Sequence, residues 1–94
     1  MPIALTKQGL ELSGRVNIDT APALKEALLT MLAQQPQGVA QVETRELSAL
    51  DVAVIQLLYA AQEGCRKRGG ALLFPAPSEA LKEMNQRAGS VLVI

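Results

Sequence analysis

The sequence predicts an α/β fold, with a mixed sheet of four to five strands and three helices, in a single domain over residues 1–94. Three observations support this prediction. The chain has 94 residues, the size of one compact unit. Apolar residues make up 49% of it, which is ample material for a core. Their spacing alternates between strand-like and helix-like periods along the chain, which is typical of a sheet covered by helices.

Two short strands begin the chain. Residues 3–6 and 10–13 are β-type runs separated by Lys7-Gln8-Gly9, which predicts a hairpin. Gly14 is the expected position of a bulge, after which Val16 and Ile18 resume the alternation.

A first helix follows the hairpin. Apolar residues recur at helical spacing from Thr20 onward, with Asp19 or Thr20 as the cap, and the pattern ends before Pro36. Residues 39–43 then alternate between apolar and polar side chains and predict the next strand.

A longer helix is expected from Asp51 to the Gly69-Gly70 stop. Asp51 suits the cap because its carboxylate can accept backbone N–H groups at the positive end of the helix dipole. Ser48 is an alternative cap, since Ser48 and Asp51 have capping-box spacing, but we prefer Asp51. The apolar stripe of this helix suits the covering of a sheet, and it consists of Val54, Leu57, Leu58, Ala61 and Cys65.

The last quarter of the chain predicts a strand at residues 71–74, a helix at residues 77–88 with Gly89 as its stop, and a short strand at residues 91–94. The two helical crossovers before these elements imply parallel neighbouring strands. The segment from Val91 to Ile94 is wholly apolar, so it must be covered by the sheet or by another chain, and a homodimer is one way to cover it.

The composition excludes most enzyme chemistry and several classes of partner. The chain has no histidine and one cysteine, so we expect no catalytic residues, no metal site and no cofactor. Nine basic residues balance nine acidic ones, and only Phe74 and Tyr59 are aromatic, so we expect no nucleic-acid binding. The apolar runs are too short for membrane insertion, and the first residues lack the features of a secretory signal. A cytoplasmic protein is expected.

Three segments together resemble the STAS domain, the family of bacterial anti-sigma-factor antagonists and their relatives. They are GRVNIDTAPAL at residues 14–24, LDVAVIQLL at residues 50–58 and RGGALL at residues 68–73. The resemblance covers nearly the whole chain. It implies a STAS-like single domain that binds proteins and is not an enzyme.

The resemblance also points to a missing switch. In that family the serine or threonine directly after the helix-opening aspartate is the usual phosphoacceptor, and here that position is Val52. Valine has no hydroxyl group, so no phosphorylation is expected at Val52. Ser48 and Thr44, which we expect in the loop before Asp51, are the remaining candidates. Glu43 is a second departure, because relatives generally carry Asp or Asn there.

One face of the second helix is a candidate binding surface. Val52, Gln56, Tyr59 and Glu63 follow one another at steps of three and four, opposite the core stripe, and Ala53 lies beside them. An exposed stripe of this kind suits a protein partner. The alternative is that these residues are merely the edge of the core. Asp19 and Thr20 are expected at the same end of the sheet, because both helices begin just beyond strand ends.

Three functions follow from these patterns. The leading one is a regulator that binds an anti-sigma factor, a kinase or a chemotaxis-type signalling protein through Asp51, Val52, Ala53, Gln56, Tyr59, Asp19 and Thr20. The alternative is an accessory role in transport, because the chain also resembles the small STAS subunit of a lipid-transporting ABC system. The partner of that subunit is the ATPase. The third, an enzyme, requires Asp19, Glu43 and Asp51 to converge at the strand ends.

Overall fold

The computed structural model describes residues 2–34 and 38–94, and its strands form one mixed sheet in the order β1-β2-β3-β4. Strand β1 is antiparallel to β2, while β2, β3 and β4 run parallel. The elements along the chain are β1 (Ile3–Leu5), β2 (Gly9–Val16), α1 (Ala21–Gln34), β3 (Val39–Leu50), α2 (Val52–Lys67), β4 (Ala71–Leu73) and α3 (Glu79–Arg87). The predicted fold class and the amino-terminal hairpin are confirmed.

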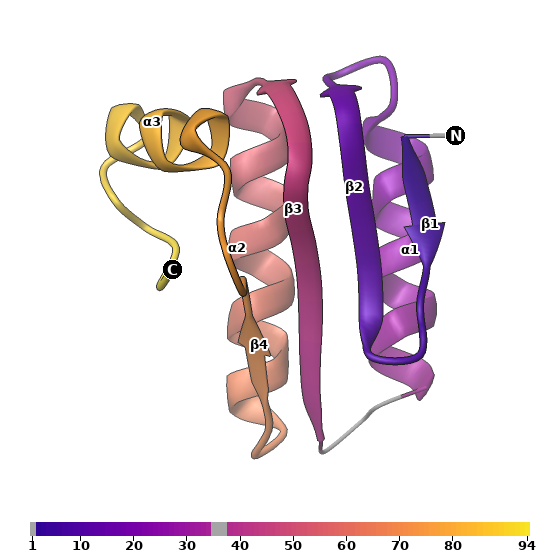
Figure 1. Cartoon of the computed structure of the whole chain (residues 1–94). Coiled ribbons are helices and arrows are strands. Elements are labelled where there is room, and N and C mark those ends of the chain that lie inside the picture. Colours follow the sequence, from indigo (N-terminus) through magenta and orange to yellow (C-terminus); the bar gives the residue numbers. More distant parts are fainter. Residues whose placement is uncertain (1, 35–37) are drawn as a thin grey trace.

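Helices α1 and α2 lie side by side on one face of the sheet, and α3 lies beyond β4 at one end (Figure 1). The core fills the space between the two helices and the sheet. Strands β2 and β3 contribute alternate side chains to it, among them Leu10, Leu12 and Val42, which are fully buried. In α2 the predicted stripe is confirmed except at Leu57, which is half-buried beside α1, whereas Ile55 is fully buried.

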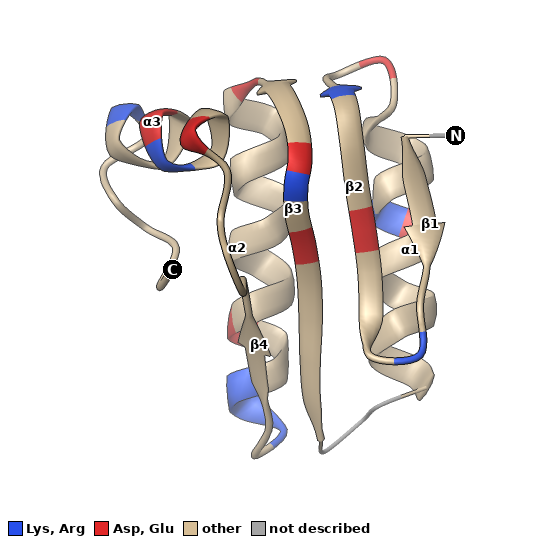
Figure 2. Cartoon of the chain, in the orientation of Figure 1, with Lys and Arg blue, Asp and Glu red and all other residues tan. Residues whose placement is uncertain are grey.

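The other face of the sheet carries charged side chains. Figure 2 shows acidic and basic residues along β2 and β3. Glu11 of β2 is the direct register partner of Glu43 of β3. Arg45 and Glu46, the next charged residues of β3, are exposed. The alternation of apolar and polar residues in these strands thus separates a core face from a polar face.

Strand β3 is much longer than the predicted strand at residues 39–43. Its pairing with β2 shifts between Glu11 and Ser13 and again between Gly14 and Arg15, and at each shift β3 has one extra residue. Each bulge moves the buried positions of β3 by one, so the simple alternation holds through Thr44 and then breaks. The bulge expected at Gly14 is confirmed, and Gly14 has a left-handed φ of 64°.

Three residues lie elsewhere than predicted. Thr44 and Ser48 lie within β3, not in a loop before Asp51; Thr44 is fully buried, and Ser48 is exposed and donates its hydroxyl to the carbonyl oxygen of Gly14. Strand β2 ends at Val16, so Ile18 does not continue it.

The prediction of a fifth strand at residues 91–94 is wrong. This segment, which we call the strap, is outside the sheet. The side-chain amide of Gln62 donates both to the carbonyl oxygen of Leu72 in β4 and to that of Val93 in the strap, at 3.0 and 2.9 Å. An amide side chain therefore occupies the edge of β4 where a fifth strand would pair.

The helix ends are set by local hydrogen bonds. Asp51 caps α2, as preferred over Ser48, and Ser78 caps α3, so this helix begins two residues after the predicted start at Pro77. The predicted stop of α1 at Pro36 lies outside the described residues.

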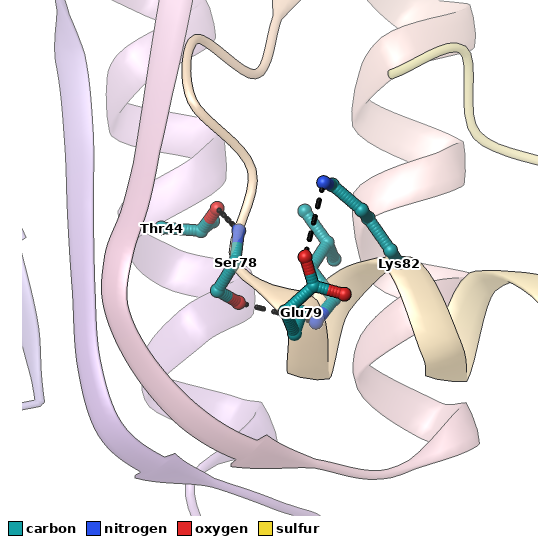
Figure 3. Close-up of polar contacts among 5 residues, drawn as sticks. Thr44, Ser78, Glu79 and Lys82 are labelled. Carbon is teal, nitrogen blue, oxygen red and sulfur yellow. Dashed lines mark hydrogen bonds and ion pairs between the residues drawn. The ribbon is translucent and has the colours of Figure 1, made fainter.

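Thr44 attaches α3 to the sheet. The backbone N–H of Ser78 donates to the hydroxyl oxygen of Thr44 at 3.3 Å, and the Ser78 hydroxyl accepts from the N–H of Leu81 at 3.1 Å (Figure 3). Glu79 and Lys82 form an exposed ion pair on the outside of the same turn. A hydroxyl inside the core therefore holds the start of α3 against the middle of β3.

We expect Thr44→Val to lower the free energy of unfolding by about 1–2 kcal/mol, because the N–H of Ser78 loses its acceptor while the packing volume stays similar. Urea unfolding measures this change. Thr30→Val, at an exposed position of α1, is the matched control and should change the free energy by less than about 0.5 kcal/mol. Equal effects of the two substitutions would contradict the role given to Thr44.

Candidate functional site

The carboxylate of Asp51 connects two segments at one end of the sheet. Its Oδ1 accepts the N–H of Val54 at 3.2 Å, which caps α2, and its Oδ2 accepts the N–H of Ile18 at 2.8 Å. Asp51 itself has an extended backbone, with φ −119° and ψ 179°, as capping residues do. Both oxygens are therefore used to fix the start of α2 beside the loop that leads from β2 to α1.

That loop, residues 17–20, is held by its own hydrogen bonds. The N–H of Asn17 donates to the Thr20 hydroxyl at 2.9 Å, and this hydroxyl donates to the carbonyl oxygen of Asn17 at 2.9 Å. The N–H of Asp19 donates to Asn17 Oδ1 at 3.0 Å. Thr20 therefore stabilises the turn with its hydroxyl, while the side chain of Asp19 is exposed.

The parallel strands bring the two helix starts together. Strands β2 and β3 run in the same direction, so the chain leaves both at the same end of the sheet, where α1 and α2 begin (Figure 1). The expectation that Asp19 and Thr20 lie at the same end as Asp51 is confirmed by the bond between Ile18 and Asp51.

The outer face of α2 exposes the predicted stripe. Val52 and Tyr59 have 45% and 41% of their surface exposed, and Gln56 between them is also exposed. Ala53 is half-buried beside them. Further along, Glu63 accepts from Arg66 at 2.6 Å, and this hydrogen bond lowers the pKa of the Glu63 carboxyl group. The expectation that the stripe faces solvent is thus met at Val52, Gln56 and Tyr59.

Ile18 is an exposed residue at this end of the sheet that the sequence analysis missed. It was expected as a strand residue, but 66% of its surface is exposed in the loop whose backbone is bonded to Asp51. The signal in the sequence was the Asn17 and Thr20 pair, whose side chains favour a turn over a continued strand.

A shallow apolar groove lies between α1 and α2. It has a volume of about 160 Å³ and is lined by Lys25, Leu28, Leu29, Leu32, Leu57, Ala60 and Ala61. Leu29, with 57% of its surface exposed, lies at this groove. The helix pair therefore presents apolar surface to solvent beyond the loop end as well.

The carboxylates that an enzyme would need do not converge. Glu43 lies in the middle of β3 and Asp51 follows its end, eight residues later, which corresponds to roughly 25 Å along a strand. Within residues 2–34 and 38–94, no group of three histidine, cysteine, aspartate or glutamate side chains is placed to hold a metal ion. Cys65 is buried in the core, and burial raises the pKa of its thiol.

Asp51→Ala should lower the free energy of unfolding by about 1–3 kcal/mol, because it removes a helix cap and leaves the N–H of Ile18 without its acceptor. Ser78→Ala is the matched control, since it removes the cap of α3 alone. Hydrogen exchange distinguishes the two variants. The exchange rate of the Ile18 amide should rise in Asp51→Ala and stay the same in Ser78→Ala. Faster exchange in both, or in neither, would contradict the link between the loop and α2.

Comparison with known proteins identifies the family. The model of the family described as "Mlab, STAS domain" matches residues 2–90. No match was found among curated proteins. No helix in the described part of the chain has both the length and the apolar character needed to cross a membrane.

Two solved structures share the fold. One is a protein of Thermotoga maritima proposed to be an anti-sigma factor antagonist, with a TM-score of 0.67 and 12% identity, covering 95% of this chain and 78% of that chain. The other, named Mglu, has a TM-score of 0.61 and 13% identity over 80% of this chain, and this chain spans only 19% of it. At these identities the likeness shows the fold alone. With the family model matching residues 2–90, the chain belongs to the STAS domain family.

Proposed function

We propose that this chain is a non-enzymatic regulator that binds a signalling protein, such as an anti-sigma factor, a kinase or a chemotaxis-type protein. The docking surface consists of Ile18, Val52, Gln56 and Tyr59, bordered by Asp19, Thr20, Asp51 and Ala53. The observation that carries the proposal is the exposure of Ile18 and Val52, 66% and 45%, at the two segments that Asp51 holds together.

Rigidity makes this surface suitable for binding. The segments that carry Ile18 and Val52 are fixed by hydrogen bonds to one carboxylate, so they lose little backbone freedom when a partner covers them. Aromatic and apolar side chains at the centre of a patch with a polar rim are typical of protein interfaces. Tyr59 and Val52 supply the apolar part, and Gln56 and Asp19 are exposed polar neighbours.

Binding at this surface is proposed to be independent of phosphorylation at Val52, which has no hydroxyl group. Of the two remaining candidates, Thr44 is fully buried and its oxygen already accepts from Ser78, which disfavours its modification in the folded chain. Ser48 is exposed on β3 and is the more accessible of the two. Mass spectrometry of protein isolated from cells would detect a phosphate at Ser48.

The non-enzymatic character is supported by the wide separation of Glu43 from Asp51 and by the membership in a family of regulators. The Thermotoga maritima protein with the same fold is proposed to be an anti-sigma factor antagonist, which supports a protein partner as the ligand class. A cytoplasmic location and a homodimer remain predictions from the sequence.

Val52→Asp should weaken binding of the signalling partner about ten-fold or more, because an unpaired charge would be buried in the interface. It should leave the fold stable, since an acidic residue suits the first turn of α2. The affinity is measured by calorimetry with the partner identified by co-purification. Val39→Asp is the control, because Val39 is similarly exposed but lies at the other end of β3. An unchanged affinity for Val52→Asp would rule out this surface.

A second candidate is the small STAS accessory subunit of a lipid-transporting ABC system. The hydroxyl-free Val52 favours it, because a permanently bound subunit needs no phosphorylation switch at its contact surface. The family model that matches residues 2–90 is described as "Mlab, STAS domain", a description that does not mention anti-sigma factors.

The two candidates differ in what co-purifies with the chain. An ATP-hydrolysing transport subunit retained through the docking surface supports the accessory subunit. A sigma-factor regulator or a chemotaxis component retained in the same way supports the signalling role. In either case retention must be lost in Val52→Asp and kept in Val39→Asp.

A further inference from the structure

Two amide side chains hold the strap in a slot between α2 and α3. Asn85 of α3 accepts the N–H of Leu92 at 2.9 Å and donates to its carbonyl oxygen at 3.2 Å. Gln62 of α2 accepts the N–H of Val93 at 2.9 Å and donates to its carbonyl oxygen at 2.9 Å. Two successive residues of the strap thus have all their main-chain groups bound by side chains, which is a way of recognising an extended peptide.

The strap contributes little side-chain contact beyond one leucine. Leu92 is 4% exposed, whereas Val91, Val93 and Ile94 are 40%, 79% and 45% exposed. Asn85 is itself buried and forms part of the slot. An element held by four hydrogen bonds and a single buried side chain opens more easily than the core does.

The connection between α3 and the strap is a short hinge with one residue, Ser90, in an unfavourable conformation. Gly89 and Ser90 have left-handed φ values of 96° and 57°, and Ser90 is not a glycine. Their N–H groups donate to the carbonyl oxygens of Gln86 and Asn85 at 3.1 and 2.7 Å, which closes the end of the helix. Backbone strain in a short hinge is relieved when the hinge straightens, and such hinges favour exchange of the segment between copies.

We propose that the slot formed by Gln62 and Asn85 also binds the strap of a second copy, so that two chains exchange residues 91–94. The contacts of Leu92 and Val93 are the same in the closed chain and in the exchanged dimer. The two forms then differ in three ways: the strain of the hinge, which the exchange relieves; the two backbone hydrogen bonds of Gly89 and Ser90, which straightening replaces with bonds to water; and the cost of association. Straightening residues 88–90 gives the strap a reach of about 10 Å. This inference does not rest on the proposed function.

Gly89→Ala tests the exchange. A Cβ at Gly89 meets no atom within 4 Å, so the substitution adds backbone strain at φ 96° without a steric clash. The closed chain bears this strain and the straightened hinge does not. Each dimer relieves the added strain of two hinges, and each relief raises the association constant about ten-fold. The association constant should therefore rise about 100-fold over that of the unmodified chain. Sedimentation equilibrium over a range of protein concentrations measures it.

Gly69→Ala is the matched control. Gly69 has a φ of 84°, a Cβ there also meets nothing within 4 Å, and the end of α2 is closed by the same pattern of backbone hydrogen bonds. It precedes β4 and not the strap, so its strain should lower the stability without raising the association constant. Ser90→Gly acts in the opposite direction and should lower the association constant below that of the unmodified chain.

Loss of the slot should abolish the dimer. In the Gly89→Ala background, Gln62→Ala combined with Asn85→Ala should give a monomer at all concentrations. Should that combination fail to fold, Leu92→Asp removes the anchor of the strap instead and should have the same effect. A dimer that persists without the slot or the anchor, an equal rise in Gly69→Ala, or no association of Gly89→Ala would each overturn the proposal.

Discussion

The carboxylate of Asp51 joins two segments that are 33 residues apart in the sequence. One oxygen fixes the first turn of α2 and the other fixes the loop before α1, so the geometry of this end of the sheet depends on one side chain. The parallel course of β2 and β3 makes this possible, because it brings both strand ends to the same place. The segments that carry Ile18 and Val52 are therefore fixed by the same carboxylate, although each belongs to a different crossover between strands.

The geometry of this site supports the proposed role in recognition. An aspartate whose two oxygens already accept backbone N–H groups serves as a structural anchor, and the residues it positions are apolar. Val52 has no hydroxyl group at the position where the resemblance implies a phosphoacceptor, so the proposed binding does not depend on phosphorylation there.

The parts of the fold that could be predicted depend on local signals. The Asp51 cap, the core stripe of α2 and the hairpin follow from the chemistry of neighbouring residues. The length of β3 could not be predicted, because two bulges shift its alternation after Thr44. Thr44 was placed in a loop because a polar residue was not expected at a buried position. The strap was mistaken for a strand because its composition is β-forming, whereas its position is decided by Gln62 and Asn85, from helices distant in sequence. Ile18 was missed because the apolar alternation hides the turn that Asn17 and Thr20 form with their side chains around it.

The polar face of the sheet has its own consequence for how the molecule meets others. Glu11 and Glu43 stand directly opposite each other there, and with Glu46 they outnumber the single arginine, Arg45, of the depression they line. Stripping water from adjacent carboxylates of like charge is unfavourable, so a flat hydrophobic surface gains nothing by covering them. The hydrated carboxylates thus disfavour non-specific association through this face of the sheet, which leaves the helical side of the molecule for contact with partners.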